Sequence, residues 1–229
     1  ETVSSNNGTV VEIGPGRGAL TGMLAAEAQQ LVLIELDPIL AKNLQTRFAT
    51  LSHVRVICED ARLIDVGALQ ETKERPYTLV GNLPYSSAMP IVRRSLEIKH
   101  PPDVSVVMVQ REVAQSMCGL PGKRSLLSFT IGYYADAAIR FTVPPRAFSP
   151  PPEIYSSVVL LKRRASPPIG IDSADRFFNL LRAGFAAPRK TVANSLSIGL
   201  KLDSHVAISL LLKAGLSHKK RPGVLVMDD

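Results

Sequence analysis

Short apolar runs alternate with amphipathic segments through the first two thirds of the chain. The runs TVVEIG (9–14), LVLIEL (31–36), VRVIC (54–58), TLVGNL (78–83) and VSVVMVQ (104–110) are almost continuously hydrophobic. Apolar runs of this length are typical of strands that are buried on both faces. The segments GALTGMLAAEAQ, PILAKNLQTRF and AMPIVRRSLEI repeat apolar residues at helical spacing. This alternation predicts an α/β fold with a mainly parallel, doubly wound sheet.

The pattern changes in the last third of the chain. Two apolar runs, 137–143 and 156–164, flank the proline-rich stretch VPPRAFSPPPEIY and predict an antiparallel hairpin at the edge of the sheet. The linker-like segment RRASPPIG then precedes three helical patterns, ADRFFNLLRAGF, KTVANSLSIGL and SHVAISLLLKAG. We therefore predict a larger α/β domain over 1–164 and a small all-helical domain over 165–229.

Composition narrows the class of function. Lys and Arg number 27 against 20 Asp and Glu, and the net charge of +7 favours a polyanionic partner, although a basic enzyme without one fits the charge equally well. Cys58 and Cys118 show no CxxC spacing, so we expect a reducing cytoplasm. We predict no metal and no membrane span, because the four histidines lack ligand spacing and no apolar run approaches about 18 residues. The early first strand leads us to expect preceding residues in the natural chain.

Three glycines lie between the first predicted strand and the first predicted helix. In VVEIGPGRGAL, Gly14, Gly16 and Gly18 would let the backbone turn sharply and a ligand approach main-chain N–H groups. Their GxGxG spacing differs from the GxGxxG of dinucleotide sites and favours a nucleoside ligand with a different tail. A tight structural turn is the alternative for the loop taken alone.

Acidic residues follow the next two strand ends, where open α/β sheets bind ligands. Glu35 can accept hydrogen bonds from ribose hydroxyls, and Asp60 can accept one from an adenine amine. Their neighbours Leu36 and Ala61 belong to the same predicted cofactor site.

Two further acids near these strand ends have different interpretations. Glu12 could attract a ligand ammonium group or hold the glycine loop through backbone N–H groups, whereas Asp37 before Pro38 is typical of a helix N-cap. A ribose, an adenine and a cationic methionine tail fit S-adenosylmethionine, since carboxylates around a cationic cofactor are electrostatically favourable.

The fourth strand ends in Asn82-Leu83-Pro84-Tyr85, at the same edge of the sheet. The Asn82 side-chain oxygen and the Leu83 carbonyl, held by Pro84, would offer two acceptors to one amine. Tyr85 supplies a flat face for stacking. The set suits the weakly nucleophilic amine of adenine, which needs positioning more than a strong base. The alternative is a turn with Tyr85 packed in the core.

A base that is stacked in a helix cannot reach this corner, so we expect the target nucleotide to be unpaired or flipped out. Phe148, on the proline-stiffened loop AFSPPPEIYSS, is the candidate for a second aromatic side chain around the base. A hydrophobic plug under the hairpin is equally compatible with this residue.

These motifs together resemble the ribosomal RNA adenine dimethyltransferase family. The resemblance rests on VVEIGPGRGALT, VLIELDP, EDA, GNLPYSSAMPI, VMVQREVA, YYADAAIRFTVPPRAFSPPPEIYSSVV and FAAPRKTVANSL, in this order. NLPY is closer to the small-subunit enzymes than to the relatives that methylate large-subunit RNA. The resemblance implies a Rossmann-like class I methyltransferase fold with a seven-stranded sheet, and a helical domain that assists RNA binding. It also implies transfer of two methyl groups to N6 of adenines in small-subunit ribosomal RNA during ribosome biogenesis.

The resemblance also implies residue roles. Gly14, Glu35 and Asp60 lie at the cofactor, Asn82 at both the cofactor and the target amine, and Tyr85 and Phe148 around the target base. We expect RNA phosphates to be bound along one rim, with a steep salt dependence. The basic residues predicted there are Arg93, Arg94, Arg111, Lys123, Arg124, Arg146, Arg189 and Lys190, with Arg163, Arg164 and 219–221 as further members. The expected partner is a pre-30S-type particle, bound by a monomer.

Other functions remain open at this stage. A nucleic-acid-binding protein that has lost catalysis, similar to the mitochondrial transcription factors of this fold, is disfavoured by the intact 82–85 corner. A large-subunit RNA or DNA adenine methyltransferase more often carries another version of that corner. A nicotinamide-dependent dehydrogenase is disfavoured by the glycine spacing.

Overall fold

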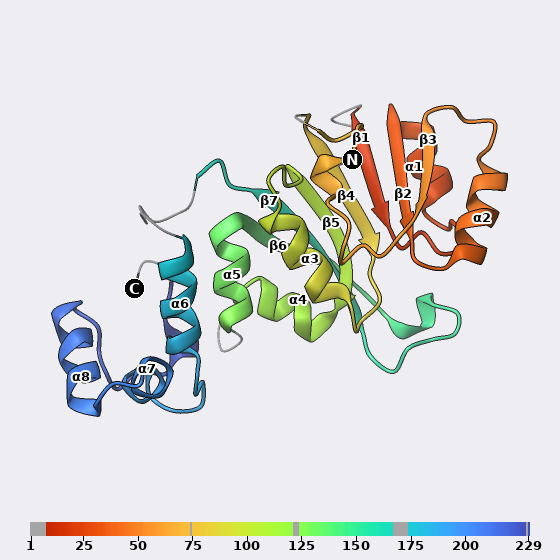
Figure 1. Cartoon of the computed structure of the whole chain (residues 1–229). Helices are drawn as coiled ribbons and strands as arrows, with labels where there is room; N and C mark the ends of the chain where they lie inside the picture. Colours follow the sequence, from red (N-terminus) through yellow and green to blue (C-terminus); the bar gives the residue numbers. More distant parts are fainter. Residues whose placement is uncertain (1–7, 74, 121–123, 167–173, 228) are drawn as a thin grey trace. The chain divides into compact units, whose positions relative to one another are not determined.

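The computed structural model of the chain describes residues 8–73, 75–120, 124–166, 174–227 and 229. Within these residues the chain forms a seven-stranded sheet in the order β3-β2-β1-β4-β5-β7-β6 (Figure 1). The strands are β1 (Thr9–Ile13), β2 (Gln30–Glu35), β3 (Val54–Cys58), β4 (Tyr77–Asn82), β5 (Val104–Gln110), β6 (Ala135–Val143) and β7 (Ser156–Arg163). The strand order changes direction between β1 and β4, which is where open α/β sheets bind ligands.

The sheet is parallel from β3 through β5 and antiparallel between β5 and β7. Val11, Val32 and Leu79 in its central strands are fully buried, as expected for parallel strands covered on both faces. β7 and β6 are hydrogen-bonded neighbours at the edge. The predicted fold, a mainly parallel α/β sheet with an antiparallel edge, is confirmed.

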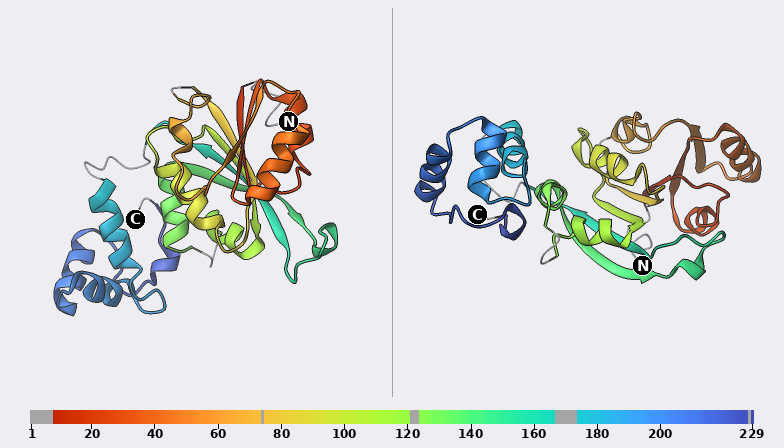
Figure 2. Two further views of the ribbon diagram at one scale, coloured as in Figure 1. Left: turned by 45° about the vertical axis from the view of Figure 1, so that its right-hand side comes forward. Right: turned by 90° about the horizontal axis from the view of Figure 1, so that it is seen from below.

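Eight helices accompany these strands within the described part of the chain. They are α1 (Thr21–Glu27), α2 (Pro38–Arg47), α3 (Ala88–Glu97), α4 (Arg111–Met117), α5 (Leu126–Tyr134), α6 (Ala174–Gly184), α7 (Val192–Leu200) and α8 (Ser204–Lys213). Leu24 of α1 and Leu44 of α2 join one hydrophobic cluster with Val10, Leu31 and Leu33 of the sheet. Helices lie on both sides of the sheet, which completes the doubly wound arrangement (Figure 2).

The start of α2 follows the sequence prediction. Asp37 is its N-cap, and its carboxylate accepts hydrogen bonds from the N–H groups of Ile39 at 2.8 Å and Leu40 at 3.2 Å. Pro38 occupies the first turn, where a missing N–H has no consequence. The structural role predicted for Asp37 and Pro38 is confirmed.

The chain divides into two compact units, residues 1–114 with 138–163, and residues 115–137 with 164–229. The sequence prediction placed all residues up to 164 in the first domain, whereas 115–137 belongs with the tail. The physical reason is an aromatic cluster between α5 and α6. Ring centroids lie 5.1 Å apart for Tyr133 and Phe177 and 5.5 Å apart for Phe129 and Phe185, and such ring pairs stabilise beyond their buried area.

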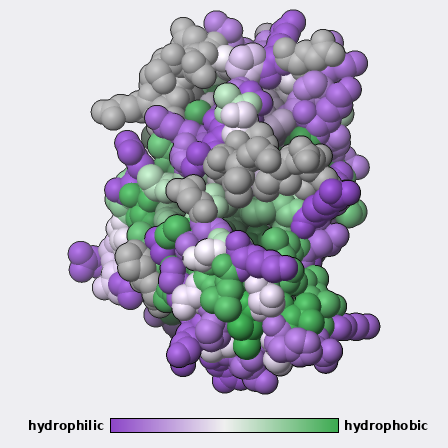
Figure 3. Space-filling model, turned by 90° about the vertical axis from the view of Figure 1, so that its left-hand side faces the viewer, coloured by the Kyte–Doolittle hydropathy of each residue, from purple (hydrophilic) through white to green (hydrophobic). Residues whose placement is uncertain are grey.

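The second unit has its own small core. Ala183, Val192, Leu196, Ala207 and Leu211 form a hydrophobic cluster that joins α6, α7 and α8. Leu180 and Leu210 are exposed and line an apolar groove of about 590 Å³ between these helices. Leu212 of α8 is also exposed. Figure 3 shows hydrophobic side chains, in green, gathered on the face of this unit. No single helix in the described ranges is long and apolar enough to cross a membrane; α7 and α8 meet that test only as a pair bent by 119°.

Candidate active site

The glycine loop follows β1 and bends through left-handed backbone conformations. Gly14, Gly16 and Gly18 have φ values of +66°, +57° and +77°, which residues with a Cβ rarely adopt. The Gly14 N–H donates to the Ile34 carbonyl at 2.9 Å, and a Cβ at Gly14 would lie 3.9 Å from the carbonyl oxygen of Asn82. The loop therefore joins the ends of β1, β2 and β4 at one edge of the sheet.

Glu35 at the end of β2 holds this loop. Its side chain accepts hydrogen bonds from the N–H groups of Gly16 at 2.9 Å and of Asp37 at 3.0 Å, and the residue is buried. The sequence left open whether Glu12 would brace the loop; in the structure Glu35 provides that contact. Each carboxylate oxygen has a second lone pair, so Glu35 can still accept from ribose hydroxyls.

Glu12 lies in β1 and is only 3% exposed. Its carboxylate accepts a hydrogen bond from the Thr21 hydroxyl at 2.7 Å. Burial raises the pKa of Glu12 above its ordinary 4.5, the Thr21 hydrogen bond partly offsets this, and the nearby charge of Glu35 raises the pKa further. The folded chain thus binds this proton more tightly than the unfolded chain. The resulting stabilisation is present below pH 4.5 and is lost as the pH rises through the raised value.

Asp60 after β3 is engaged by its own neighbour. The backbone N–H of Arg62 donates to its carboxylate at 2.8 Å, and the guanidinium Nε donates to both carboxylate oxygens at 3.0 Å. These hydrogen bonds lower the pKa of Asp60. Asp60 therefore stays ionised, but Arg62 occupies acceptor sites that the sequence assigned to an adenine amine. Beside these acids, Leu36 is 62% exposed and Ala61 is half-buried.

The corner after β4 turns straight into α3. Leu83 is 1% exposed, and its N–H donates to the Met108 carbonyl of β5 at 3.3 Å. The Pro84 carbonyl accepts from the N–H groups of Ser87 and Ala88, which fixes the turn.

Asn82 and Tyr85, which flank this buried leucine in the corner, are both exposed. Asn82 is exposed and Tyr85 is 39% exposed. The Tyr85 hydroxyl is hydrogen-bonded to the Ser156 hydroxyl at 2.8 Å. The alternative in which Tyr85 packs in the core is therefore wrong, and Asn82 is an exposed residue beside the buried Leu83.

Phe148 ends a short 3₁₀ turn, Pro145–Ala147, in the loop between β6 and β7. The residue is half-buried. In Figure 1 this loop lies beyond the same end of the sheet as the arrowheads of β1, β2 and β4. Its role at the target base stays a prediction.

The sequence of the chain matches a known protein family. A family model described as ribosomal RNA adenine dimethylase matches residues 3–218 of the 229. The chain belongs to this family. The predicted family and enzyme class are confirmed, and with them S-adenosylmethionine as the cofactor.

Individual relatives of this dimethylase agree with the assignment. A ribosomal RNA small subunit methyltransferase A of Dehalococcoides mccartyi is 36% identical over 222 residues, which cover 96% of this chain and 76% of the relative. A protein of the same name from Acidobacterium capsulatum is 44% identical over 191 residues, which cover 82% and 67%. A solved dimethyladenosine transferase from Plasmodium falciparum shares the fold, with a TM-score of 0.78 at 21% identity over 96% of this chain and 86% of that one.

The basic residues that we predicted to bind RNA fall in both units of the dimethylase. Arg93, Arg94, Arg111 and Arg146 are exposed in the first unit. Arg93 pairs with Glu97 at 2.7 Å, and the Arg111 guanidinium lies over the Tyr155 ring, 5.2 Å from its centroid. Arg94 and Arg146 form no ion pair within the described residues and are therefore the most available for phosphate.

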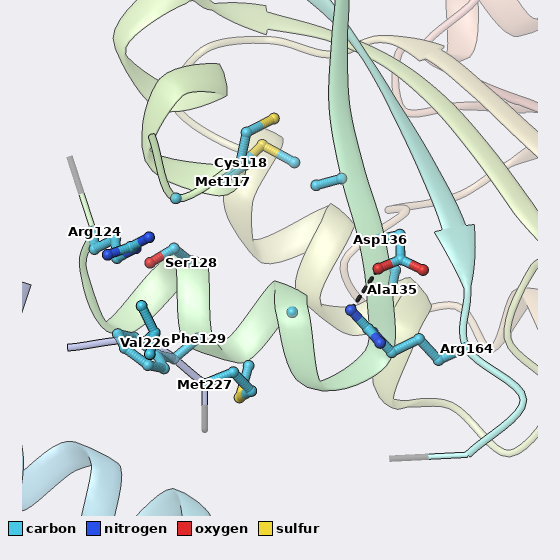
Figure 4. A pocket seen from close by; sticks show the side chains of 13 residues that line it. Met117, Cys118, Arg124, Ser128, Phe129, Ala135, Asp136, Arg164, Val226 and Met227 are labelled. Atoms are coloured by element: carbon cyan, nitrogen blue, oxygen red, sulfur yellow. Dashed lines mark hydrogen bonds and ion pairs between the residues drawn. The ribbon is translucent and has the colours of Figure 1, made fainter. Parts of the chain in front are cut away.

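In the second unit, Arg189 and Lys190 are exposed, whereas Lys123 lies outside the described residues. Arg124 is half-buried and lines a cavity of about 260 Å³ together with Ser128 and the Arg164–Asp136 ion pair (Figure 4). That all of these residues share one rim stays a prediction.

Three residues at the site escaped the sequence interpretation: Thr21, Arg62 and Ser156. Arg62 could have been suspected, because a basic residue two positions after Asp60 can reach back to it. Ser156 left no local signal, since it lies 71 residues from its partner Tyr85. Within the described ranges, no three His, Cys, Asp or Glu side chains gather as a metal site requires.

Proposed function

We propose that this dimethylase transfers two methyl groups from S-adenosylmethionine to the exocyclic N6 of an adenine in small-subunit ribosomal RNA, on an assembling pre-30S-type particle. The observation that carries the proposal is the corner after β4. There the exposed Asn82 lies next to the buried Leu83, beside the glycine loop and the strand-end acids.

The residues present fit the cofactor. A Cβ at Gly16 would meet nothing within 4 Å, so the loop leaves room for a ligand against its main chain. Glu12, Glu35 and Asp60 place three carboxylates at the ends of the adjacent strands β1, β2 and β3, which suits a cationic ligand. Glu35 and Asp60 would hold the ribose and the adenine. When bound, S-adenosylmethionine supplies an electrophilic methyl carbon.

At the corner, the Asn82 side-chain oxygen and the Leu83 carbonyl would accept hydrogen bonds from the two N–H groups of the target amine. Two converging acceptors direct the nitrogen lone pair outward and lower the cost of taking it out of conjugation with the ring. The corner is held by backbone hydrogen bonds from Leu83 to Met108 and from α3 to Pro84, so its acceptors are preorganised. Tyr85 and Phe148 would contact the two faces of the extruded base.

RNA binding would use the exposed cations of both units. Arg94, Arg146, Arg189 and Lys190 are all exposed and would contact phosphates without reading sequence directly. Shape recognition of this kind fits a structured ribosomal RNA with an unpaired target loop. We place the protein in the cytoplasm as a monomer.

The test is methyl transfer by the full chain with tritium-labelled cofactor, comparing immature small subunits, large-subunit RNA and duplex DNA as acceptors. Label should enter the small-subunit RNA, and Asn82→Ala should lower the rate by at least about a hundredfold. Asn179→Ala, an exposed asparagine on α6, is the matched control and should leave the rate unchanged. Label in large-subunit RNA or DNA, or no transfer by the unaltered chain, would overturn the proposal.

A further inference from the structure

A hydrogen bond of the Tyr85 hydroxyl joins two parts of the first unit that are distant in sequence. Tyr85 follows β4, Ser156 opens β7, and their hydroxyl oxygens lie 2.8 Å apart. In the sheet β5 lies between these two strands. The hydrogen bond therefore spans the end of β5 and ties the corner to the antiparallel edge.

Ser156 is a rigid anchor for this bond. It is 1% exposed and pairs with Gln110, the last residue of β5. The next residue, Arg111, donates its N–H to the Tyr155 carbonyl at 3.0 Å, so the backbone around Ser156 is held on both sides. Tyr85 has 39% of its surface exposed, and the hydroxyl bond fixes a ring that its surroundings cover only in part.

Ser156 also ends the loop that carries Phe148. Residues 149–155 connect the two, so the hydroxyl bond links the Tyr85 ring to the base of that loop. Tyr85 and Phe148, the two side chains proposed to contact the base, are thus both connected to the start of β7. Stacking on a base depends on the plane of the aromatic ring, and small misplacements of a substrate cost rate.

We propose that Ser156 is a positioning residue for methyl transfer, which holds the Tyr85 ring in the plane that stacks on the target adenine. This inference rests on the function proposed above. Ser156 itself would touch neither the base nor the cofactor, because it acts through the Tyr85 hydroxyl.

The proposal predicts a specific pattern in single-turnover methyl transfer to immature small subunits by the full chain. Ser156→Ala and Tyr85→Phe both remove the hydroxyl bond and keep the ring, so each should lower the rate about three- to tenfold, as expected for one lost hydrogen bond. The dissociation constant for S-adenosylmethionine should stay unchanged. The double variant should be no slower than Tyr85→Phe alone, because Ser156 acts only through Tyr85.

Ser157→Ala is the matched control. Ser157 is the next residue of β7, is fully buried, and its hydroxyl lies 3.2 Å from that of Thr142 in β6. Adjacent residues of a strand point to opposite faces of the sheet, so this change removes a comparable buried hydroxyl away from the corner. It should leave the methyl-transfer rate unchanged. A rate loss in Ser157→Ala as large as that in Ser156→Ala would overturn the proposal, because the effect would then be general to buried serines of β7.

Two further results would also overturn it: rate losses of Ser156→Ala and Tyr85→Phe that multiply, or no rate loss in either variant. Thermal unfolding of the unaltered chain, the two single variants Ser156→Ala and Tyr85→Phe, and their double variant separates this failure from a failure of the proposed function. Non-additive stabilities show the hydroxyl bond whether or not methyl transfer occurs. If the bond is present and the unaltered chain transfers no methyl group to RNA, the proposed function fails, and the positioning role fails with it.

Discussion

Replacing Glu35 by Gln tests how the cofactor site is held together. The Glu35 carboxylate accepts the N–H of Gly16 through one oxygen and that of Asp37 through the other. A glutamine offers one oxygen and one NH₂ group, so in either orientation one of the two backbone donors faces another donor. A hydrogen bond to a charged group is worth about 1.5–3 kcal/mol, and Glu35 is buried, so solvent cannot replace the lost partner.

We therefore expect Glu35→Gln to weaken S-adenosylmethionine binding roughly ten- to a hundredfold, since about 1.4 kcal/mol corresponds to a factor of ten. Isothermal titration calorimetry of the full chain measures this directly. Glu59→Gln is the control, because it makes the same chemical change at an exposed carboxylate at the same edge of the sheet. Equal affinity in Glu35→Gln and the unaltered chain, or an equal loss in Glu59→Gln, would refute the reasoning.

Three further predictions concern charged residues of the chain. Glu12→Gln removes a buried charge, so it should raise the melting temperature at pH 7 by a few degrees (~1 kcal/mol) and flatten the pH dependence of the melting temperature above pH 4.5. It should also weaken cofactor binding. A lower melting temperature would contradict the buried-charge argument. Arg62→Ala should tighten cofactor binding by about two- to fivefold in a titration, because it frees the Asp60 carboxylate and removes a nearby positive charge. Weaker binding would show instead that Arg62 contributes to cofactor binding. Arg94→Ala and Arg146→Ala should each reduce the slope of log affinity for RNA against log salt by about one in filter binding, and unchanged slopes would exclude them from the phosphate contacts.

The parallel sheet could be predicted from sequence because its strands are buried on both faces and read as short apolar runs. The helices α4 and α5 were missed. The sequence of α5, LLSFTIGYY, is rich in β-branched and aromatic residues and lacks a polar face, since Phe129, Ile131 and Tyr133 are all buried. Without a recognised helix there, the aromatic cluster that assigns 115–137 to the second unit could not be foreseen.

The sequence predicts which residues of the candidate site lie at the same edge of the sheet, because the topology of the sheet determines that edge. Parallel strands present their carboxyl ends at one edge, so Glu35, Asp60 and Asn82 could be grouped from their positions after apolar runs. Side-chain partners depend on rotamers and on distant segments, and the sequence pattern contains neither. For that reason the Arg62 pairing with Asp60 and the Ser156 contact with Tyr85 emerged only from the structure.

We propose that N6 of an adenine in small-subunit RNA receives two methyl groups at the Asn82 corner. Mass analysis of nucleosides from immature small subunits, incubated with the full chain and S-adenosylmethionine, tests it most directly. We expect N6,N6-dimethyladenosine with the unaltered chain and none above background with Asn82→Ala. Methylation on another base or on ribose, or dimethyladenosine that persists in Asn82→Ala, would contradict it.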